Sequence, residues 1–219
     1  MEKSRDVWTI SSLLNWTINY FKSKGIESAR LDAEVLLSHV LGQKRIYLYV
    51  HFDEPMEAKE LVKFREYVAK RARHIPVAYI LGQREFMGLD FKVTKDTLIP
   101  RPDTEILVEN TIAKVNENFG DKQSYDIVDI GTGSGAIILS LLKNLPKAKG
   151  FTVDISANAV AVAKENAQNL QVDDRCEFFV GDLFEPVKDK VFDVIVSNPP
   201  YIPQKDIANL EIDVKDYEP

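Results

Sequence analysis

The stretch D-I-V-D-I-G-T-G-S-G-A, residues 126–136, passes from a short apolar run through three alternate glycines into a second apolar run. Residues 126–130 have the length and composition of a buried strand, and residues 136–142 continue as an apolar helix. Alternate glycines let the backbone turn sharply into a helix N-terminus and approach a ligand closely. The stretch therefore predicts a strand, a ligand-binding loop and a helix in succession.

The same alternation of strand and helix continues after this stretch. Residues 151–154, 176–180 and 192–197 read as further short apolar strands, and residues 157–169 form a helix between the first two. Strands that alternate with helices in this way are typical of a doubly wound α/β fold with a parallel sheet. Ligands bind such sheets at the carboxyl ends of the strands, where the strand order reverses.

Three acidic residues stand at the ends of successive predicted strands. The glycine loop alone does not identify a ligand, because G-T-G-S-G-A also fits the dinucleotide pattern G-x-G-x-x-A. Asp129 precedes the loop, Asp154 closes the second strand and Asp182 follows the third. A carboxylate after the second strand can accept hydrogen bonds from a ribose diol. Each acid could be a helix cap or a turn residue, but the three together favour a nucleoside site.

The last predicted strand breaks into N-P-P-Y, which comprises Asn198, Pro199, Pro200 and Tyr201. Two consecutive prolines fix φ and cannot donate to a sheet ladder, so the strand stops and the backbone keeps one rigid shape. That shape is either a plain stop signal or a device that aims Asn198 and Tyr201 at a ligand.

The first part of the chain has helical periodicity instead. Helices are predicted over residues 13–24 and 28–41, which end at Gly25 and Gly42, and from near Asp53 and Pro55 to about His74. These helices predict a small bundle over residues 1–74. The third helix has an apolar face and an opposite basic face, the latter formed by Lys59, Lys63, Lys70 and Arg73. Ordinary solvation explains a basic face without aromatics better than a docking surface for RNA or protein does.

A connector over residues 75–103 separates the two parts. The segment E-F-M-G-L-D-F-K-V, residues 85–93, alternates around Gly88 and predicts a short hairpin. In L-I-P-R-P-D-T-E, which follows, Asp103 or Thr104 can cap the next helix. Residues 1–103 hold 17 Lys and Arg against 14 Asp and Glu, whereas residues 104–219 hold 11 against 20. This asymmetry predicts different roles for the two halves.

Composition limits which kinds of protein the chain can be. The one cysteine, Cys176, permits no internal disulfide and is most simply a buried small residue. The three histidines (His39, His51 and His74) lack metal-ligand spacing, so we expect no metal; His39 should pack on its helix and His74 should orient the connector. No leader pattern or apolar run of about 18 residues is present, which predicts a cytoplasmic protein.

The motifs together resemble a known family. D-I-G-T-G-S-G-A-I, with Asp154, Asp182 and N-P-P-Y, resembles the class I methyltransferases that use S-adenosylmethionine and modify a planar nitrogen. H-I-P-V-A-Y-I-L-G-Q-R-E-F-M-G and L-I-P-R-P-D-T-E narrow the resemblance to the HemK/PrmC family, protein-(glutamine-N5) methyltransferases of peptide chain release factors. The resemblance implies a Rossmann-like methyltransferase domain at residues 104–219, after a hairpin connector and a helical domain at residues 1–74 that helps to dock the release factor.

The resemblance also implies roles for single residues. The loop would hold the methionine end of the cofactor, Asp154 its ribose and Asp182 with Leu183 its adenine; the loop residues are Gly131, Thr132, Gly133, Ser134 and Gly135. Asn198, which would also contact the cofactor, would bind the substrate glutamine together with Pro199, Pro200 and Tyr201. Asn198, Pro199 and Tyr201 would be the catalytic residues, with no strong general base, and the product would be S-adenosylhomocysteine.

Three alternatives stay open at this point. The first is an N-methyltransferase of nucleic-acid exocyclic amines. Like an amide, such an amine is conjugated and therefore a poor nucleophile, but an enzyme of this kind would be expected to have a more basic catalytic half. The second is a glutamine methyltransferase of ribosomal proteins, and the third is an inactive cofactor-binding fragment. Because family members continue past E-P (Glu218, Pro219) with further strands, we expect an incomplete sheet, an exposed apolar edge at residues 192–197 and weak cofactor binding.

Overall fold

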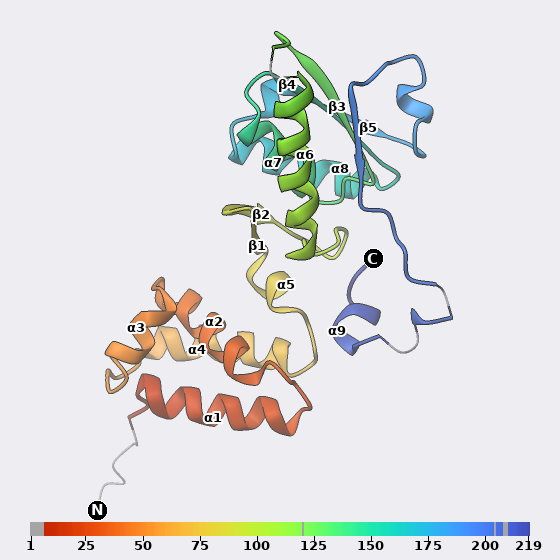
Figure 1. The fold of residues 1–219 in the computed structure, drawn as a ribbon. Coiled ribbons are helices and arrows are strands. Elements are labelled where there is room, and N and C mark those ends of the chain that lie inside the picture. Colours follow the sequence, from red (N-terminus) through yellow and green to blue (C-terminus); the bar gives the residue numbers. More distant parts are fainter. Residues whose placement is uncertain (1–6, 120, 204, 208–209) are drawn as a thin grey trace, which may run out of the picture. The chain divides into compact units, whose positions relative to one another are not determined.

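Two compact units make up the chain, Met1–Leu81 and Gly82–Pro219. The computed structural model describes residues 7–119, 121–203, 205–207 and 210–219. Within these residues the first unit holds helices only, and the second holds both sheets (Figure 1). Of the helices described, none combines the length and the apolar character needed to cross a membrane.

From residue 7 on, where the structure describes it, the first unit packs five helices around one apolar core. They are α1 (Ile10–Ser23), α2 (Ala29–Leu41), α3 (Arg45–Val50), α4 (Ala58–Arg71) and α5 (Val77–Leu81). Gly25 and Gly42 follow α1 and α2 with φ of 75° and 63°, the left-handed conformation in which glycine ends a helix. The predicted helical bundle and both predicted stops are therefore confirmed.

The predicted start of the third helix near Asp53 and Pro55 is wrong. Helix α4 begins at Ala58, and the side chain of Glu60 accepts a hydrogen bond from the Glu57 N–H at 2.8 Å. The segment before it is extended because its backbone pairs with the start of α1: Ile10 N–H donates to the carbonyl of Glu54, and Met56 N–H donates to that of Trp8. This pairing between residues far apart in the chain overrides the local capping signal.

The predicted faces of α4 are confirmed. Phe64 and Val68 are buried, and Lys59, Lys63 and Lys70 on the opposite face are exposed; Arg73 is exposed too but follows the end of the helix. Arg71 lies on the buried side, where its Nε donates to Asp32 Oδ2 of α2 at 2.7 Å. Burying both charges has a desolvation cost that offsets much of their attraction, so we do not expect this ion pair to add a large net stability. Its role is instead to fix α4 against α2.

The second unit contains a four-stranded parallel sheet of order β5-β4-β3-β6. Its strands are β3 (Tyr125–Ile130), β4 (Ala148–Asp154), β5 (Cys176–Val180) and β6 (Val194–Ser197). Helices α6 (Asp103–Phe119), α7 (Ala136–Asn144) and α8 (Ala157–Asn169) contribute to the main core on one face (Figure 1). A smaller cluster around Val128 and Phe151 covers the other face, together with Val187 of the 3₁₀ turn η2 (Glu185–Val187). The predicted α/β fold class is confirmed.

Strand order reverses beside β3. The chain moves outward from β3 through β4 to β5 and then returns to place β6 on the opposite side of β3. The carboxyl ends of β3 and β6 therefore form the switch point at which such sheets bind ligands. On the outer side of β6, no strand is paired in the described part of the chain, and Ile195 is 59% exposed, which confirms the predicted apolar edge.

A short hairpin opens the second unit. Strands β1 (Gln83–Phe86) and β2 (Leu89–Lys92) pair antiparallel around Met87 and Gly88, whose φ values are 52° and 70°. Two central residues with positive φ are typical of the tight turn that matches strand twist. The hairpin predicted around Gly88 is confirmed, and its Phe86 and Phe91 are buried in the main core of this unit. The described part of this unit also holds two short helical elements, the 3₁₀ turn η1 (Asp173–Arg175) and α9 (Ile212–Lys215).

Candidate functional site

The glycine loop lies between β3 and α7, with open space over part of it. Gly131 and Gly133 have φ of 78° and 54°, and a Cβ added at either would meet no atom within 4 Å. Both residues thus need glycine for their backbone conformation, and a ligand can approach their backbone without obstruction. Gly135 differs, because its Cβ would lie 2.9 Å from Leu139 Cδ1, so it also keeps the loop close to α7.

Asp154 joins the end of β4 to this loop. Its Oδ2 accepts a hydrogen bond from the Gly133 N–H at 2.8 Å, and its Oδ1 accepts one from the Ser156 N–H at 2.9 Å. An ionised carboxylate has about four acceptor sites, so these two bonds leave capacity for further donors. The side chain is half-buried, which keeps it within reach of a ligand such as a diol.

Asp129 lies fully buried under the loop. The Thr132 hydroxyl donates to its Oδ2 at 3.0 Å, and its Oδ1 has no partner among the described atoms. Burial, with a smaller contribution from the nearby negative charge of Asp154, raises the pKa of this carboxyl to about 7. Asp129 is therefore neither a helix cap nor a solvated turn residue, which were the alternatives expected from its place in the sequence.

Asp182 and Leu183 follow β5 in an exposed turn. The Glu185 N–H donates to the carbonyl of Asp182 at 2.9 Å and closes the turn. Leu183 is 61% exposed and has φ of 44°, a conformation that is rare for a bulky side chain. Backbone strain of this kind concentrates at ligand sites, and the exposed leucine offers an apolar surface beyond β5.

The N-P-P-Y segment begins where β6 ends, next to the end of β3. The Ser197 hydroxyl donates to the carbonyl of Ile130 at 2.7 Å, so Asn198 follows one strand at the point where Gly131 follows its neighbour. The Asn198 side-chain nitrogen donates to Thr104 Oγ1 at 3.3 Å. Tyr201 is 78% exposed, so its ring is available to a ligand.

The R-P-D-T-E motif contacts several parts of the second unit. Helix α6 begins at Asp103 itself, so Asp103 and Thr104 lie in its first turn rather than ahead of it as caps. Arg101 pairs with Glu218 in the C-terminal segment, and Glu105 Oε1 accepts a hydrogen bond from the Met87 N–H of the hairpin at 2.7 Å. With the Thr104 contact to Asn198, the motif links the hairpin, the N-P-P-Y segment and the C-terminal segment.

The carboxyl ends of the four parallel strands bring the predicted site residues to one edge of the sheet. In sheet order this edge runs from Asp182 beyond β5 through Asp154 and the glycine loop to Asn198. Sequence reasoning did not single out Thr104 as a partner of Asn198, and no local pattern reveals that contact. It also missed Asn166, although an Asn on the apolar face of α8, beside Val162, Ala163 and Ala167, is a signal that could have drawn attention to it.

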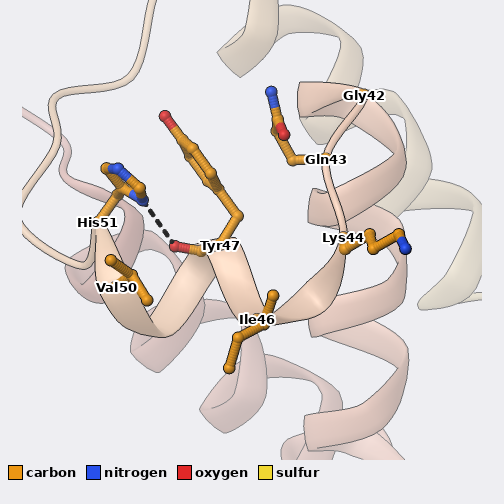
Figure 2. Close-up of a pocket in the computed structure, with 7 residues that line it drawn as sticks. All are labelled: Gly42, Gln43, Lys44, Ile46, Tyr47, Val50 and His51. Atoms are coloured by element: carbon orange, nitrogen blue, oxygen red, sulfur yellow. Dashed lines mark hydrogen bonds between the residues drawn. The ribbon is translucent and has the colours of Figure 1, made fainter.

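A separate hollow in the helical unit is lined by none of these predicted site residues. It measures about 510 Å³ and is lined by Gly42, Gln43, Lys44, Ile46, Tyr47, Val50 and His51. Figure 2 shows His51 beside Tyr47, with its Nδ1 3.3 Å from the Tyr47 carbonyl oxygen. The two rings stack at 3.9 Å between centroids, so this histidine has a packing role. His39 packs on the ring of Tyr67, which belongs to α4 and not to the helix of His39 itself, whereas Cys176 is buried, as expected.

Two family models match the chain, a PrmC N-terminal domain over residues 12–82 and a methyltransferase small domain over residues 104–212. Among similar proteins, a release factor glutamine methyltransferase of Rhodopirellula baltica is 45% identical and one of Geobacter sulfurreducens is 46% identical. Each of these alignments covers 100% of this chain and 74% of the relative. A protein of the same name from Chlorobaculum tepidum is 42% identical over 97% of this chain and 74% of its own length.

Proposed function

The chain belongs to the release factor glutamine methyltransferase family, and from this membership we infer its reaction and the parts that its residues take in it. It is an enzyme that transfers a methyl group from S-adenosylmethionine to the side-chain amide nitrogen of a release factor glutamine. The alternatives expected from the sequence, a nucleic-acid amine, a ribosomal-protein glutamine or an inactive fragment, are not favoured, because the relatives carry the release factor name.

The loop and the acids beside it support the proposed cofactor roles. Gly131 and Gly133 leave room for the methionine end over the loop that also includes Thr132, Ser134 and Gly135. Asp154 has acceptor capacity left for the ribose hydroxyls. Asp182 would accept from the adenine amine while the exposed Leu183 packs on the ring. S-adenosylmethionine supplies a methyl group on a sulfonium sulfur, which keeps the electron pair when nitrogen attacks in line.

Asn198 and Pro199 would orient the substrate amide. A carboxamide nitrogen is a poor nucleophile, since its lone pair is delocalised into the carbonyl. If the Asn198 side-chain oxygen and the Pro199 carbonyl each accept one N–H, the nitrogen is fixed toward the methyl group and the positive charge that develops on it is stabilised. Such orientation lowers barriers by up to roughly 7–11 kcal/mol in favourable intramolecular models.

Thr104 would select the orientation of the Asn198 amide. The Asn198 nitrogen donates to Thr104 Oγ1, so the amide oxygen is the group left for the substrate N–H. Tyr201 has an exposed ring that can pack on the substrate amide plane and exclude water, and Pro200 keeps the segment rigid between them. After transfer the alkylated amide is strongly acidic, and its proton leaves to an accepting oxygen or to water without a dedicated base.

The proposal also covers the substrate protein and the roles of the parts of the chain. We propose that the substrate is the glutamine in the Gly-Gly-Gln motif of a class 1 release factor and that the enzyme acts in the cytoplasm without binding nucleic acid directly. The helical part, residues 1–74, would help to dock that factor, residues 75–103 would form the connector and residues 104–219 would perform methyl transfer. Separate cores in the two units support two distinct roles.

The observation that carries the proposed mechanism is the position of Asn198 and Gly131 after two neighbouring parallel strands. The test incubates the chain with methyl-labelled S-adenosylmethionine, a class 1 release factor and, separately, a factor whose motif glutamine is replaced by alanine. We expect label only on the intact motif, located by peptide mass mapping. Label on both factors, or on added RNA instead, would refute the assignment.

The same assay with Asn198→Ala separates the two halves of the proposed site. We expect turnover to fall by at least about 100-fold, the scale of losing one transition-state hydrogen-bonding group, while calorimetric affinity for S-adenosylhomocysteine changes little. Equal loss of turnover and affinity would place Asn198 mainly in the cofactor site and contradict its substrate role.

A further inference from the structure

Asn166 of α8 is a buried polar residue outside the predicted site. Its side chain is fully buried and makes three hydrogen bonds within the second unit. Oδ1 accepts from the Lys92 N–H at 2.8 Å, while Nδ2 donates to the Lys92 carbonyl at 2.9 Å and to the Ser134 carbonyl at 2.8 Å. One side chain therefore joins strand β2 of the hairpin to the glycine loop.

The chemistry of the partners fixes the orientation of this amide. The two carbonyl oxygens can only accept, and the Lys92 N–H can only donate. Rotating the amide by half a turn would face its oxygen toward two carbonyls and its nitrogen toward an N–H. A carboxamide is the side chain that supplies two donors on one atom and an acceptor on the other, so the position requires Asn itself rather than any small polar residue.

The bond to Ser134 holds one peptide plane of the loop from both sides. The carbonyl of Ser134 accepts from Asn166, and the N–H of the same peptide, which belongs to Gly135, donates to the Thr132 carbonyl at 2.9 Å. Because a peptide unit is planar, these two bonds together fix the direction of the last loop peptide before α7. The rest of the loop backbone, which would face a ligand, is joined directly to that peptide, so its position depends on the same two bonds.

The hairpin depends on several further anchors to the unit. Lys92 Nζ lies 2.6 Å from Glu165 Oε2 in an exposed ion pair, and the Met87 N–H donates to Glu105 at the start of α6. The exposed ion pair contributes little, because both side chains are about half accessible. The buried contact from Asn166 is the one that reaches the loop.

We infer that Asn166 is a positioning residue that couples the hairpin to the cofactor loop: binding at the loop steadies strand β2, and loss of the coupling weakens binding. The inference rests on the proposed role of residues 131–135 in holding S-adenosylmethionine. By thermodynamic linkage the two effects are reciprocal, since a ligand that favours the held loop must also favour the held hairpin. The hairpin would in this way set cofactor affinity without touching the cofactor.

The first test is amide hydrogen exchange on the unaltered chain, with and without saturating S-adenosylhomocysteine. The Lys92 amide reports the contact directly, because its N–H is the donor to Asn166. We expect ligand to slow its exchange by about 5- to 150-fold, the usual range of coupling between sites. Unchanged exchange at Lys92 while the loop amides slow would overturn the coupling.

The second test compares Asn166→Asp with Glu165→Gln. The Asp variant preserves size but presents oxygens to two carbonyls, whereas the Gln variant disrupts only the neighbouring exposed ion pair to the same lysine. By calorimetry we expect the Kd for S-adenosylhomocysteine to rise about 5- to 150-fold in the first variant and to change by less than about threefold in the second. Equal Kd values for the Asp variant and the unaltered chain would overturn the inference.

The remaining outcomes are also decisive. If Asn166→Asp does not fold, the exchange experiment on the unaltered chain still settles the coupling in either direction. If the unaltered chain binds no S-adenosylhomocysteine, the proposed cofactor site fails and this inference fails with it. Binding by the unaltered chain without slowing at Lys92 overturns this inference alone.

Discussion

The carboxyl of Asp129 should give the second unit a characteristic pH dependence. Burial raises its pKa from 3.8 to about 7, so between these values the folded chain holds a proton that the unfolded chain releases. The stability that this group contributes is complete below about pH 4 and is lost as the pH rises toward 7. We expect Asp129→Asn to gain stability relative to the unaltered chain over that window, by up to about 4 kcal/mol. Urea unfolding from pH 4 to 8 measures this difference.

Asp193 provides a control of opposite sign. The Lys122 ammonium and then the Asp126 N–H lower the pKa of its carboxyl, so its contribution is present above the unfolded pKa and is lost as the pH falls. Asp193→Asn should therefore lose stability relative to the unaltered chain as the pH rises from acid, by a small amount because solvent reaches both side chains of the pair. A pH-independent difference for Asp129→Asn would contradict the buried, protonated carboxyl.

Thr104 should affect turnover without affecting cofactor binding. Its Oγ1 accepts from the Asn198 side chain, so Thr104→Val leaves the Asn198 amide free to rotate while it keeps the shape of the residue. Loss of one such bond, about 1–1.5 kcal/mol, should lower kcat about tenfold, and Thr104→Ser should restore most of it. Thr111→Val is the matched control, because the Thr111 hydroxyl bonds to the Leu107 carbonyl within the same helix. Equal losses in both valine variants would show a general effect on α6.

At the scale of elements, Gly135 is constrained by conformation and by packing together. Its φ is 82°, and an added Cβ would lie 2.9 Å from Leu139 Cδ1 and 3.3 Å from Ala163 Cβ. Gly88 in the hairpin has φ of 70° and open space, so Gly88→Ala isolates the conformational cost of about 1–2 kcal/mol. We expect Gly135→Ala to cost a further 1–3 kcal/mol approximately, for overpacking between α7 and α8. Urea unfolding measures the free energy of unfolding of both variants. Equal losses of stability would mean that Leu139 and Ala163 move aside at no cost in free energy.

The elements also show which features can be read from the sequence. Strands β3 to β6 are short apolar runs followed by turn residues, and the glycines at residues 25, 42 and 88 mark local conformations, so local patterns predict them. The start of α4 is different, because residues 52–56 pair with α1 across the unit and this pairing outweighs the capping signal at Asp53. The bond from Asn166 to Ser134 joins residues 32 apart, and its partners are backbone atoms that any sequence would supply.

At the scale of the whole molecule, the hairpin belongs to the second unit. The two units divide after Leu81, and Phe86 and Phe91 pack into the same core as Val108 and Ile127. The sequence places residues 75–103 between two halves of different charge, but it does not indicate which core receives the hairpin. Packing decides this, and it brings the hairpin turn to Glu105 and strand β2 to Asn166.

The longest-range prediction concerns Arg101 and Glu218, which are 117 residues apart in the sequence and form an ion pair. The Glu218 side chain is 3% exposed and its Oε2 has no partner among the described atoms, whereas Arg101 is 38% exposed. Removing Arg101 alone therefore leaves a buried charge unpaired, which is more costly than removing both charges. In a double-mutant cycle of Arg101→Met and Glu218→Gln, we expect the double variant to be more stable than the sum of the single losses predicts, by about 0.5–3 kcal/mol.

The exposed pair of Lys114 and Glu117 sets the baseline for that cycle. Both side chains are more than 60% accessible, so Lys114→Met with Glu117→Gln should show a coupling of about 0.5 kcal/mol or less. Urea unfolding of the four single and two double variants gives both coupling energies under one condition. A coupling for Arg101 and Glu218 no larger than this baseline would mean that the C-terminal segment is not held to the R-P-D-T-E motif. A larger coupling would show that Glu218 is held to Arg101 of the R-P-D-T-E motif, the motif whose Thr104 also accepts the hydrogen bond from Asn198.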